Sequence, residues 1–175
     1  FHASFPWNSF GAFVTNPLSL RSRKPSSHPK VLDYPSGFLL HTGLPNPGLG
    51  NAGRKFALQW SASSLPVIVH VMADRPEETA RMVRSLEGVE NVMAVELGFT
   101  PLSTEDLIHA SLKLAVGEIP LIVSLPAEQA VSLGARLVGA GAAAVCLSAP
   151  RGALPMPASQ ATGSGEKMAS GRLYG

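Results

Sequence analysis

Four short, continuously apolar runs divide the second half of the chain at regular intervals. They begin near residues 66, 92, 120 and 143 and read PVIVHVM, VMAVEL, PLIVSL and AAVCL. The starts recur about every 25 residues, and polar segments with helical periodicity lie between them. Strands that alternate with helices at this spacing form parallel sheets, and uninterrupted apolar runs are typical of strands covered on both faces.

The segments between the runs carry helix signals. Asp74 is a predicted N-cap for residues 74–86, with Pro76 in the first turn. Ser103 and Thr104 can cap the next helix, and a third is expected to begin near Ala127. Helical spacing predicts buried stripes at Ala80 or Met82 with Val83 and Leu86, then at Leu107, Ile108, Ser111 and Leu114, and finally at Val131, Ala135 and Val138.

The two ends of the chain are less regular. Residues 12–20 (AFVTNPLSL) predict one more strand, which Pro17 interrupts. Residues 22–48 are rich in Pro, Gly and Ser and predict a long loop, and a modest helix is expected over about 51–61. The tail, 150–175, is predicted to be a loop or a hairpin.

These elements predict an α/β fold, a partial (β/α)8 TIM barrel of about five parallel strands with outer helices. We expect strands near 12–16, 67–72, 92–97, 120–125 and 143–148. A complete barrel has eight strands and eight helices in about 250 residues. We therefore expect residues 1–175, which begin at Phe1, to be a single partial domain cut from a longer protein. Its parts are a strand and long loop (1–65), three to four βα units (66–149) and the tail (150–175).

Composition narrows the function classes. Apolar residues make up 45% of the chain and charged residues 15%, which favours a real core over disorder. The net charge of +2 is too small and too scattered for a nucleic-acid surface, and no run reaches the roughly 20 apolar residues of a membrane span. Metal-ligand spacing is absent. A single cysteine, Cys146, excludes an internal disulfide and favours a reducing compartment, so we expect a cytoplasmic protein.

The order of several motifs resembles the class 1 dihydroorotate dehydrogenases. The segment that opens GAFVTNPLSL and ends GLPNPG resembles the second strand and following loop of that family. PVIVHVMA, AVELGFT, PLIVSLP and AAVCLSA resemble its third to sixth strands, and the tail SGRLYG the segment before its sixth helix. The resemblance implies an FMN-dependent oxidoreductase of pyrimidine biosynthesis that binds a small-molecule substrate at the barrel mouth. Self-association into a homo-oligomer is left open.

Transferring the family's residues one by one implies flavin contacts at Thr15, Asn16 and Ser124 and substrate contacts at Gly43, Leu44 and Asn46. Asn16 and Ser124 stand where the family has lysines, Gly98 where it has an asparagine, and Pro101 at or near its general base. Proline has no titratable group and serine no positive charge, so we expect no catalytic residue for dihydroorotate oxidation in this chain.

Three functional hypotheses therefore stay open. The first is a flavin oxidoreductase homologue that lacks the catalytic base and the flavin lysines. The second is a non-catalytic binding or regulatory paralogue on the same scaffold. The third is a different enzyme, because this fold hosts many reactions.

Individual polar residues have simpler interpretations. Cys146 is expected to be a small buried apolar residue rather than a nucleophile, and His70 a hydrogen-bonded histidine of the core or mouth rather than a ligand contact. Glu96, inside an apolar strand, is expected to have a structural hydrogen-bonding role. The basic cluster at Arg21, Arg23 and Lys24 is expected to be solvated, with attraction of an anionic ligand as the alternative.

Overall fold

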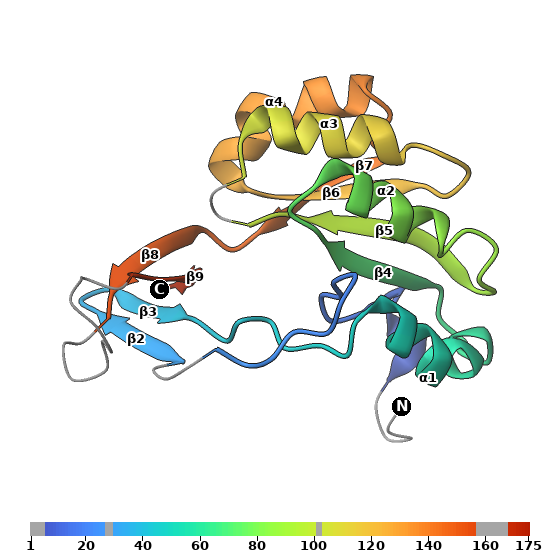
Figure 1. Cartoon of the computed structure of the whole chain (residues 1–175), viewed down its shortest axis with the longest axis horizontal. Helices are drawn as coiled ribbons and strands as arrows, with labels where there is room; N and C mark the ends of the chain where they lie inside the picture. The colour runs from blue at the N-terminus through green and yellow to red at the C-terminus, as the bar shows by residue number, and fades with distance from the viewer. Residues whose placement is uncertain (1–5, 27–29, 101–102, 157–167) are drawn as a thin grey trace.

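The structure is a computed structural model that describes residues 6–26, 30–100, 103–156 and 168–175. Figure 1 shows two sheets joined by long connections, with helices packed against the larger sheet. The chain opens with a 3-10 turn, η1 (Trp7–Ser9). Among the described residues, no helix has the length and apolar character needed to cross a membrane.

The larger sheet confirms the predicted partial barrel. In the described residues it holds five parallel strands in the spatial order β1-β4-β5-β6-β7, which form a half-barrel. All five lie where the apolar runs predicted them, at β1 (Phe13–Val14), β4 (Val67–Met72), β5 (Val92–Gly98), β6 (Leu121–Pro126) and β7 (Ala144–Ser148).

Four helices of the described chain also match the predicted segments, at α1 (Leu49–Ser61), α2 (Pro76–Arg84), α3 (Glu105–Ala115) and α4 (Ala127–Gly139). The main core lies between the larger sheet and these helices, because alternate strand positions point toward them. On the strands it contains Val67, Val69, Val71, Val95, Leu97, Leu121, Val123 and Leu125. The intervening positions, which include His70, Glu96 and Ser124, face the barrel interior.

The helix starts agree with the sequence in part. Thr104 caps α3, since its hydroxyl accepts a hydrogen bond from the backbone N–H of Leu107. The prediction for Asp74 was wrong: the N-cap of α2 is Arg75, and no side chain caps this helix. Pro76 still occupies the first turn, where a missing N–H costs nothing.

The predicted apolar stripes hold for α2 but not for the later helices. On α3, Ile108 and Ser111 are buried while Leu114 is exposed. On α4 the predicted side was the wrong one, because Val131 is 91% exposed and Leu133 and Leu137 are buried instead. Two faces of α4 are apolar, so periodicity alone could not choose between them, and packing against β6 and β7 decided. Ala135 and Val138 are exposed on the unpacked face.

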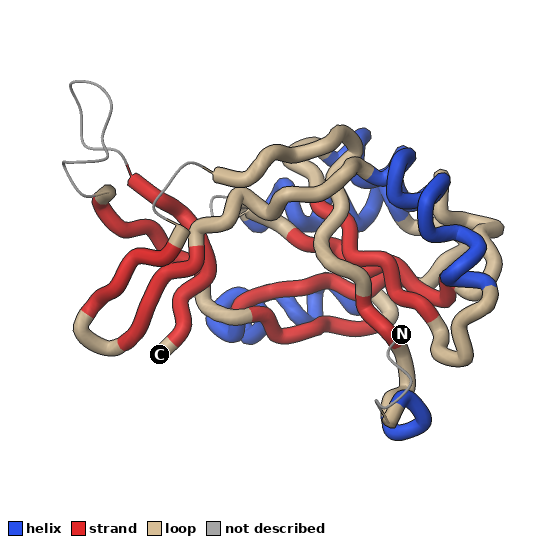
Figure 2. The backbone as a smooth tube through the Cα atoms, turned by 90° about the horizontal axis from the view of Figure 1, so that it is seen from below, coloured by secondary structure: helices blue, strands red, loops and turns tan. Residues whose placement is uncertain are grey.

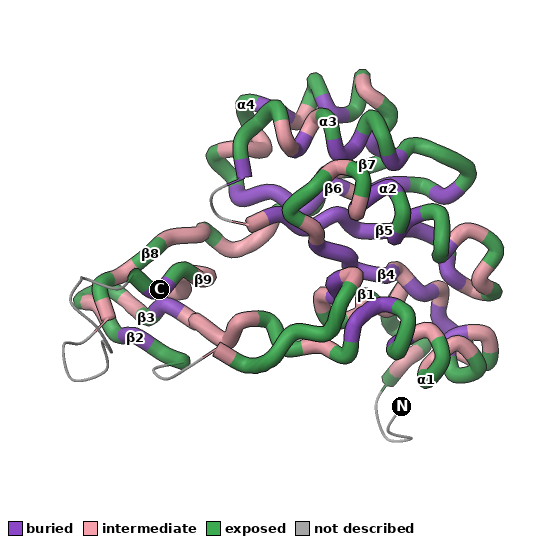
Figure 3. The backbone as a smooth tube through the Cα atoms, in the orientation of Figure 1, coloured by how far each residue is buried: buried purple, intermediate pink, exposed green. Residues whose placement is uncertain are grey.

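A second, antiparallel sheet corrects the prediction of a continuous loop over residues 22–48. That segment contains the hairpin β2 (Val31–Tyr34) and β3 (Gly37–Leu40). The tail forms a second hairpin, β8 (Arg151–Pro155) and β9 (Met168–Tyr174), as one of the two predicted forms. The strands pair in the order β2-β3-β9-β8 around a small core, with Leu39 and Ala169 fully buried. Figure 3 shows that this sheet is much less buried than β4, β5 and β6.

Candidate functional site

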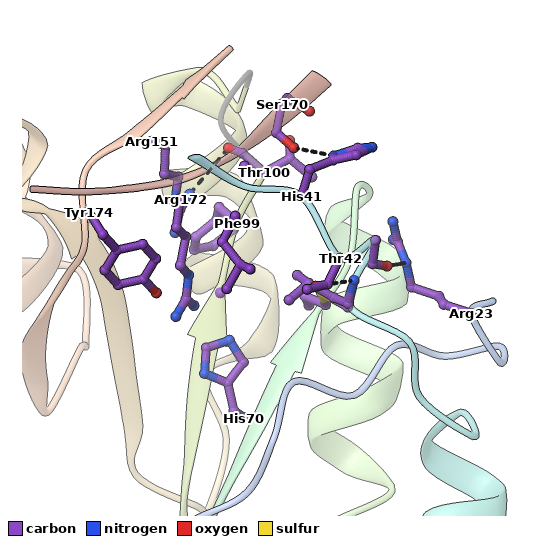
Figure 4. Close-up of a pocket in the computed structure, with 16 residues that line it drawn as sticks. Arg23, His41, Thr42, His70, Phe99, Thr100, Arg151, Ser170, Arg172 and Tyr174 are labelled. Carbon is purple, nitrogen blue, oxygen red and sulfur yellow. Dashed lines mark hydrogen bonds between the residues drawn. The ribbon is translucent and has the colours of Figure 1, made fainter. Parts of the chain in front are cut away.

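A pocket of about 250 Å³ lies between the two sheets, beyond the carboxyl ends of β4 and β5. In TIM barrels this end of the strands carries the active site. Figure 2 shows the antiparallel sheet standing at one end of the half-barrel, and Figure 4 shows the pocket's side chains. The half-barrel supplies His70, Met72, Gly98, Phe99 and Thr100; the loop before α1 and the second sheet supply Arg23, Leu40, His41, Thr42, Gly43, Leu44, Arg151, Ser170, Gly171, Arg172 and Tyr174.

A buried histidine–glutamate pair forms the floor of this pocket. His70 on β4 and Glu96 on β5 are direct neighbours in the sheet, and 3.3 Å separate His70 Nδ1 from Glu96 Oε2. The backbone N–H of His70 also donates a hydrogen bond to the Thr15 hydroxyl at 3.0 Å. These contacts agree with the structural roles expected for both residues.

The surroundings of Glu96 keep it ionised despite its burial. Desolvation raises the pKa of this carboxyl, but the hydrogen bond and positive charge that His70 can supply, with hydrogen bonds from Ser124 and Cys146, outweigh it. The net result is a pKa below the ordinary value. A row of interacting polar side chains therefore crosses the interior of the half-barrel. It runs from His70 on β4 through Glu96 on β5 and Ser124 on β6 to Cys146 on β7.

Cys146 on β7 is the last residue in this row of polar side chains, and it lies beside Ser124 in the sheet register. The expectation of a buried thiol was wrong, because β7 is the last strand in the described order and Cys146 is exposed. Partial desolvation and the nearby Glu96 charge raise the pKa of the thiol, and the Arg172 charge only partly opposes them. Cys146 is thus kept protonated, which does not favour a nucleophilic role.

Gly98 makes room for His70. A Cβ atom at this position would collide with Nε2 of the imidazole, so the ring fills the space that a side chain would need. Gly98 is also the position where the family pattern has asparagine. A side chain such as asparagine at this position would therefore not fit beside His70 as the ring is placed.

Of the three predicted substrate-contact residues, two line the pocket and the third stabilises the loop that carries them. Gly43 and Leu44 line the pocket, both with positive φ, and a Cβ on Gly43 would collide with the Ser26 backbone. Asn46 holds the loop instead: its amide oxygen accepts from the N–H groups of Ser19 and Gly48, and its amide nitrogen donates to Leu44 O. Arg23, from the predicted basic cluster, lines the pocket and donates through Nε to Gly43 O.

The predicted flavin-contact residues do not gather at the pocket. Thr15 is engaged with the His70 backbone, Asn16 is exposed, and Ser124 is buried beneath the pocket next to Glu96. None of the three is among the residues that line the pocket in the described part of the chain. Pro101, the position of the family's base, lies outside the described residues.

Sequence reasoning missed the pocket residues Arg151, Arg172 and Tyr174. They belong to the second sheet, and Arg151 donates a hydrogen bond to Thr100 O at the end of β5, which joins the two sheets. The available signal was weak: two arginines in a tail otherwise rich in Gly, Ala and Ser. Only the pairing of β8 with β9 places them together.

Comparison with known proteins supports the resemblance found in the motifs. No protein-family model matches the chain. It is 28% identical over 150 residues to the catalytic subunit of dihydroorotate dehydrogenase B (NAD(+)) from Desulforudis audaxviator, covering 79% of this chain and 49% of that protein. The subunit of the same name from Pyrococcus furiosus is 32% identical over 87 residues, which are 50% of this chain and 28% of that protein.

A further relative comes from the second branch of these enzymes. The putative dihydroorotate dehydrogenase A (fumarate) of Aeropyrum pernix is 29% identical over 150 residues, covering 78% of this chain and 49% of that protein. The chain thus spans about half the length of the curated relatives with the longest matches. The chain is thus similar over more than three quarters of its length to dihydroorotate dehydrogenases, and its parallel half-barrel is consistent with a divergent member of that family.

Proposed function

We propose that this chain is the ligand-binding half of a dihydroorotate-dehydrogenase-like flavoprotein homologue that does not itself oxidise dihydroorotate. The relatives and the pocket at the carboxyl ends of β4 and β5 support a small-molecule site. The more specific proposal is that the chain has lost the residues for dihydroorotate oxidation, and it rests on the side chains at the positions of the family's lysine and general base.

The observation that carries the proposal is a neutral hydroxyl, Ser124, at the position where the family pattern has a lysine. Reduced flavin is anionic near its pyrimidine ring, and a nearby lysine stabilises it. In this chain Ser124 takes the lysine's position and lies beside Glu96, whose pKa is lowered. The positive charge that would stabilise the reduced flavin is therefore missing at this position.

FMN is the cofactor that the family implies, and the described residues do not fit it in the family's manner. The positions transferred as flavin contacts, Thr15, Asn16 and Ser124, offer hydroxyls and an amide but no cation, and they do not line the pocket. A pocket of about 250 Å³ is also small for a nucleotide cofactor, since ligand pockets usually enclose roughly 300–1,000 Å³.

Proton removal from dihydroorotate lacks its base as well. Pro101 stands at or near the position of the family's cysteine or serine, and its side chain has no proton to exchange. Loss of a general base costs on the order of 10²–10⁴-fold in rate. The proposal thus predicts a defect in both half-reactions, independent of whether some flavin binds.

The test is a reconstitution assay with the full chain. We expect that FMN, dihydroorotate and either fumarate or NAD⁺ give no turnover above free FMN, while the Aeropyrum pernix relative serves as the positive control. An absorbance spectrum of the protein after gel filtration reports retained flavin separately. Turnover well above free flavin would overturn the proposal.

A non-catalytic binding role is the second candidate, and one observation favours it. The loop that carries Gly43 and Leu44 is held in a defined shape by the hydrogen bonds of Asn46, so a binding surface persists where the oxidative residues are missing. Ligand binding without any chemical change of the ligand, followed by NMR, would distinguish it from a different enzyme on the same scaffold.

Location and assembly are further parts of the proposal. Cys146 is an exposed free thiol, which suits a reducing compartment, and we place the protein in the cytoplasm. Self-association is proposed because one edge of β7 has no partner strand among the described residues.

A further inference from the structure

Two arginines face each other across the second sheet at the pocket. Arg151 on β8 and Arg172 on β9 are direct partners in the antiparallel register, so their side chains leave the sheet on the same face. Like charges in directly opposed positions destabilise a sheet, because the Coulomb repulsion is strongest at this spacing. A pair of this kind requires either solvent or a counter-charge.

Solvent screening is limited for this pair, because both residues are only partly exposed in the pocket. Burial and then the positive charge of Arg172 lower the pKa of Arg151, and the attraction of Glu128 on α4 does not compensate. Arg151 has one hydrogen bond, to Thr100 O at 3.3 Å. Positive charge therefore remains in excess here.

The guanidinium of Arg172 has still less support. Within the described residues it makes no hydrogen bond and no ion pair, although a guanidinium offers five N–H donors. None of the sixteen described residues that line the pocket is Asp or Glu. Figure 4 shows Arg172 and Tyr174 extending from the second sheet into the pocket, toward the side where His70 lies.

The opposite wall presents a hydrogen-bonding group to the same space. His70 holds Glu96 with Nδ1, so Nε2 points to the side of Gly98, which also lines the pocket. Phe99 and Tyr174 add aromatic surface to the same pocket. The pocket thus combines cationic side chains, aromatic surface and the imidazole of His70.

We propose that this pocket binds a small oxyanion, a carboxylate or a phosphate, between Arg151 and Arg172, with the rest of the ligand reaching Nε2 of His70. The inference deepens the proposed function, because it names the ligand chemistry of the same pocket. Paired guanidinium groups match the planar oxygens of a carboxylate or the tetrahedral oxygens of a phosphate, and both give strong charge-assisted hydrogen bonds. A cavity of about 250 Å³ suits a small organic acid.

The experiment measures binding of three probes to the full chain by calorimetry and NMR at physiological ionic strength, which screens unspecific surface attraction. Inorganic phosphate and malonate separate the two oxyanion sources, and orotate tests an aromatic carboxylate. The variants are Arg172→Gln and Arg151→Gln, with Arg172→Lys as the milder change. Arg84→Gln, an exposed arginine on α2, is the matched control.

We expect at least one of the three probes to bind, and Arg172→Gln to weaken that binding about tenfold or more, as loss of a charge-assisted bond predicts. Arg172→Lys should bind with intermediate affinity and Arg84→Gln as the native chain. Without ligand, Arg172→Gln should raise the melting temperature, because it removes repulsion from Arg151. A bound anion should raise the melting temperature of the native chain more than that of the variant.

Equal affinity of the native chain and Arg172→Gln, or no binding of any probe, would overturn the inference. A melting temperature lowered by Arg172→Gln would also count against it, since it would show a structural role for the guanidinium. These outcomes are separate from the proposed function, which fails only if dihydroorotate is turned over.

Discussion

The imidazole of His70 occupies the space in which a side chain at Gly98 would lie. A Cβ built on Gly98 falls far inside contact distance of Nε2, and Cε1 and Cδ2 of the ring are also close. His70 in turn is fixed from below by Glu96, so the ring has little freedom to move. The two positions are therefore coupled, and together they define the floor of the pocket.

Gly98→Ala should destabilise the protein by about 1–3 kcal/mol, because overpacking of a buried site forces the ring away from Glu96. The cost should shrink in a His70→Ala background, where the space is free. Denaturant unfolding of both single variants and the double variant measures this coupling. Gly134→Ala on α4 is the control, since a Cβ there meets nothing and should be neutral or stabilising. Equal costs of Gly98→Ala in the two backgrounds would contradict the coupling.

Glu96 should contribute a pH-dependent part of the stability. Its pKa in the folded chain lies below the ordinary value of 4.5, so the stabilisation is complete above that value. It is lost as the pH falls from there through the folded pKa, because protonation removes the interaction with His70. Unfolding free energies near pH 7 and about pH 3 should therefore differ less for Glu96→Gln than for the native chain. The exposed Glu90→Gln should keep the native pH dependence, and a native-like acid dependence of Glu96→Gln would refute the assignment.

Ser111→Ala should stabilise the protein by roughly 1 kcal/mol. The Ser111 hydroxyl on α3 is buried and has no hydrogen-bond partner among the described residues, so alanine removes a desolvation cost and adds helix propensity. Thermal unfolding measures the change. Ser132→Ala on the exposed part of α4, where the hydroxyl bonds Gln129 O, should stay within about 0.5 kcal/mol of the native chain. A clear loss of stability in Ser111→Ala would show that the hydroxyl has a partner.

The chain expressed alone should associate through β7. This strand is at one edge of the five-stranded sheet in the described residues, and Leu147 on it is 66% exposed. Unpaired edges with apolar side chains recruit other chains. Size-exclusion chromatography should show concentration-dependent assembly that Leu147→Lys reduces, while Leu58→Lys, at an exposed position on α1, should not. A native chain that is monomeric with one sharp unfolding transition would disprove this expectation.

Local pattern was enough to predict the half-barrel. The apolar runs that begin at Val67 and Val92 are themselves typical of buried strands. Because helices alternate with these runs, only a few sheet topologies are possible. Thr104 as a helix cap was also readable, because capping involves a residue and the backbone three positions ahead. These features depend on neighbours in the chain, so the sequence by itself determined them.

Tertiary structure decided the remaining features, and with them the site. The strand Gly37–Leu40 pairs with Met168–Tyr174, and four residues carry too little periodicity to reveal a partner so distant in the chain. The pairing of Arg151–Pro155 with the same strand, Met168–Tyr174, places Arg151 beside Arg172 at the pocket whose floor holds His70 and Glu96. Which face of α4 is buried and whether Cys146 is covered were also left open by the residues. In each case the energy comes from contacts between distant segments, and no local pattern encodes which segments meet.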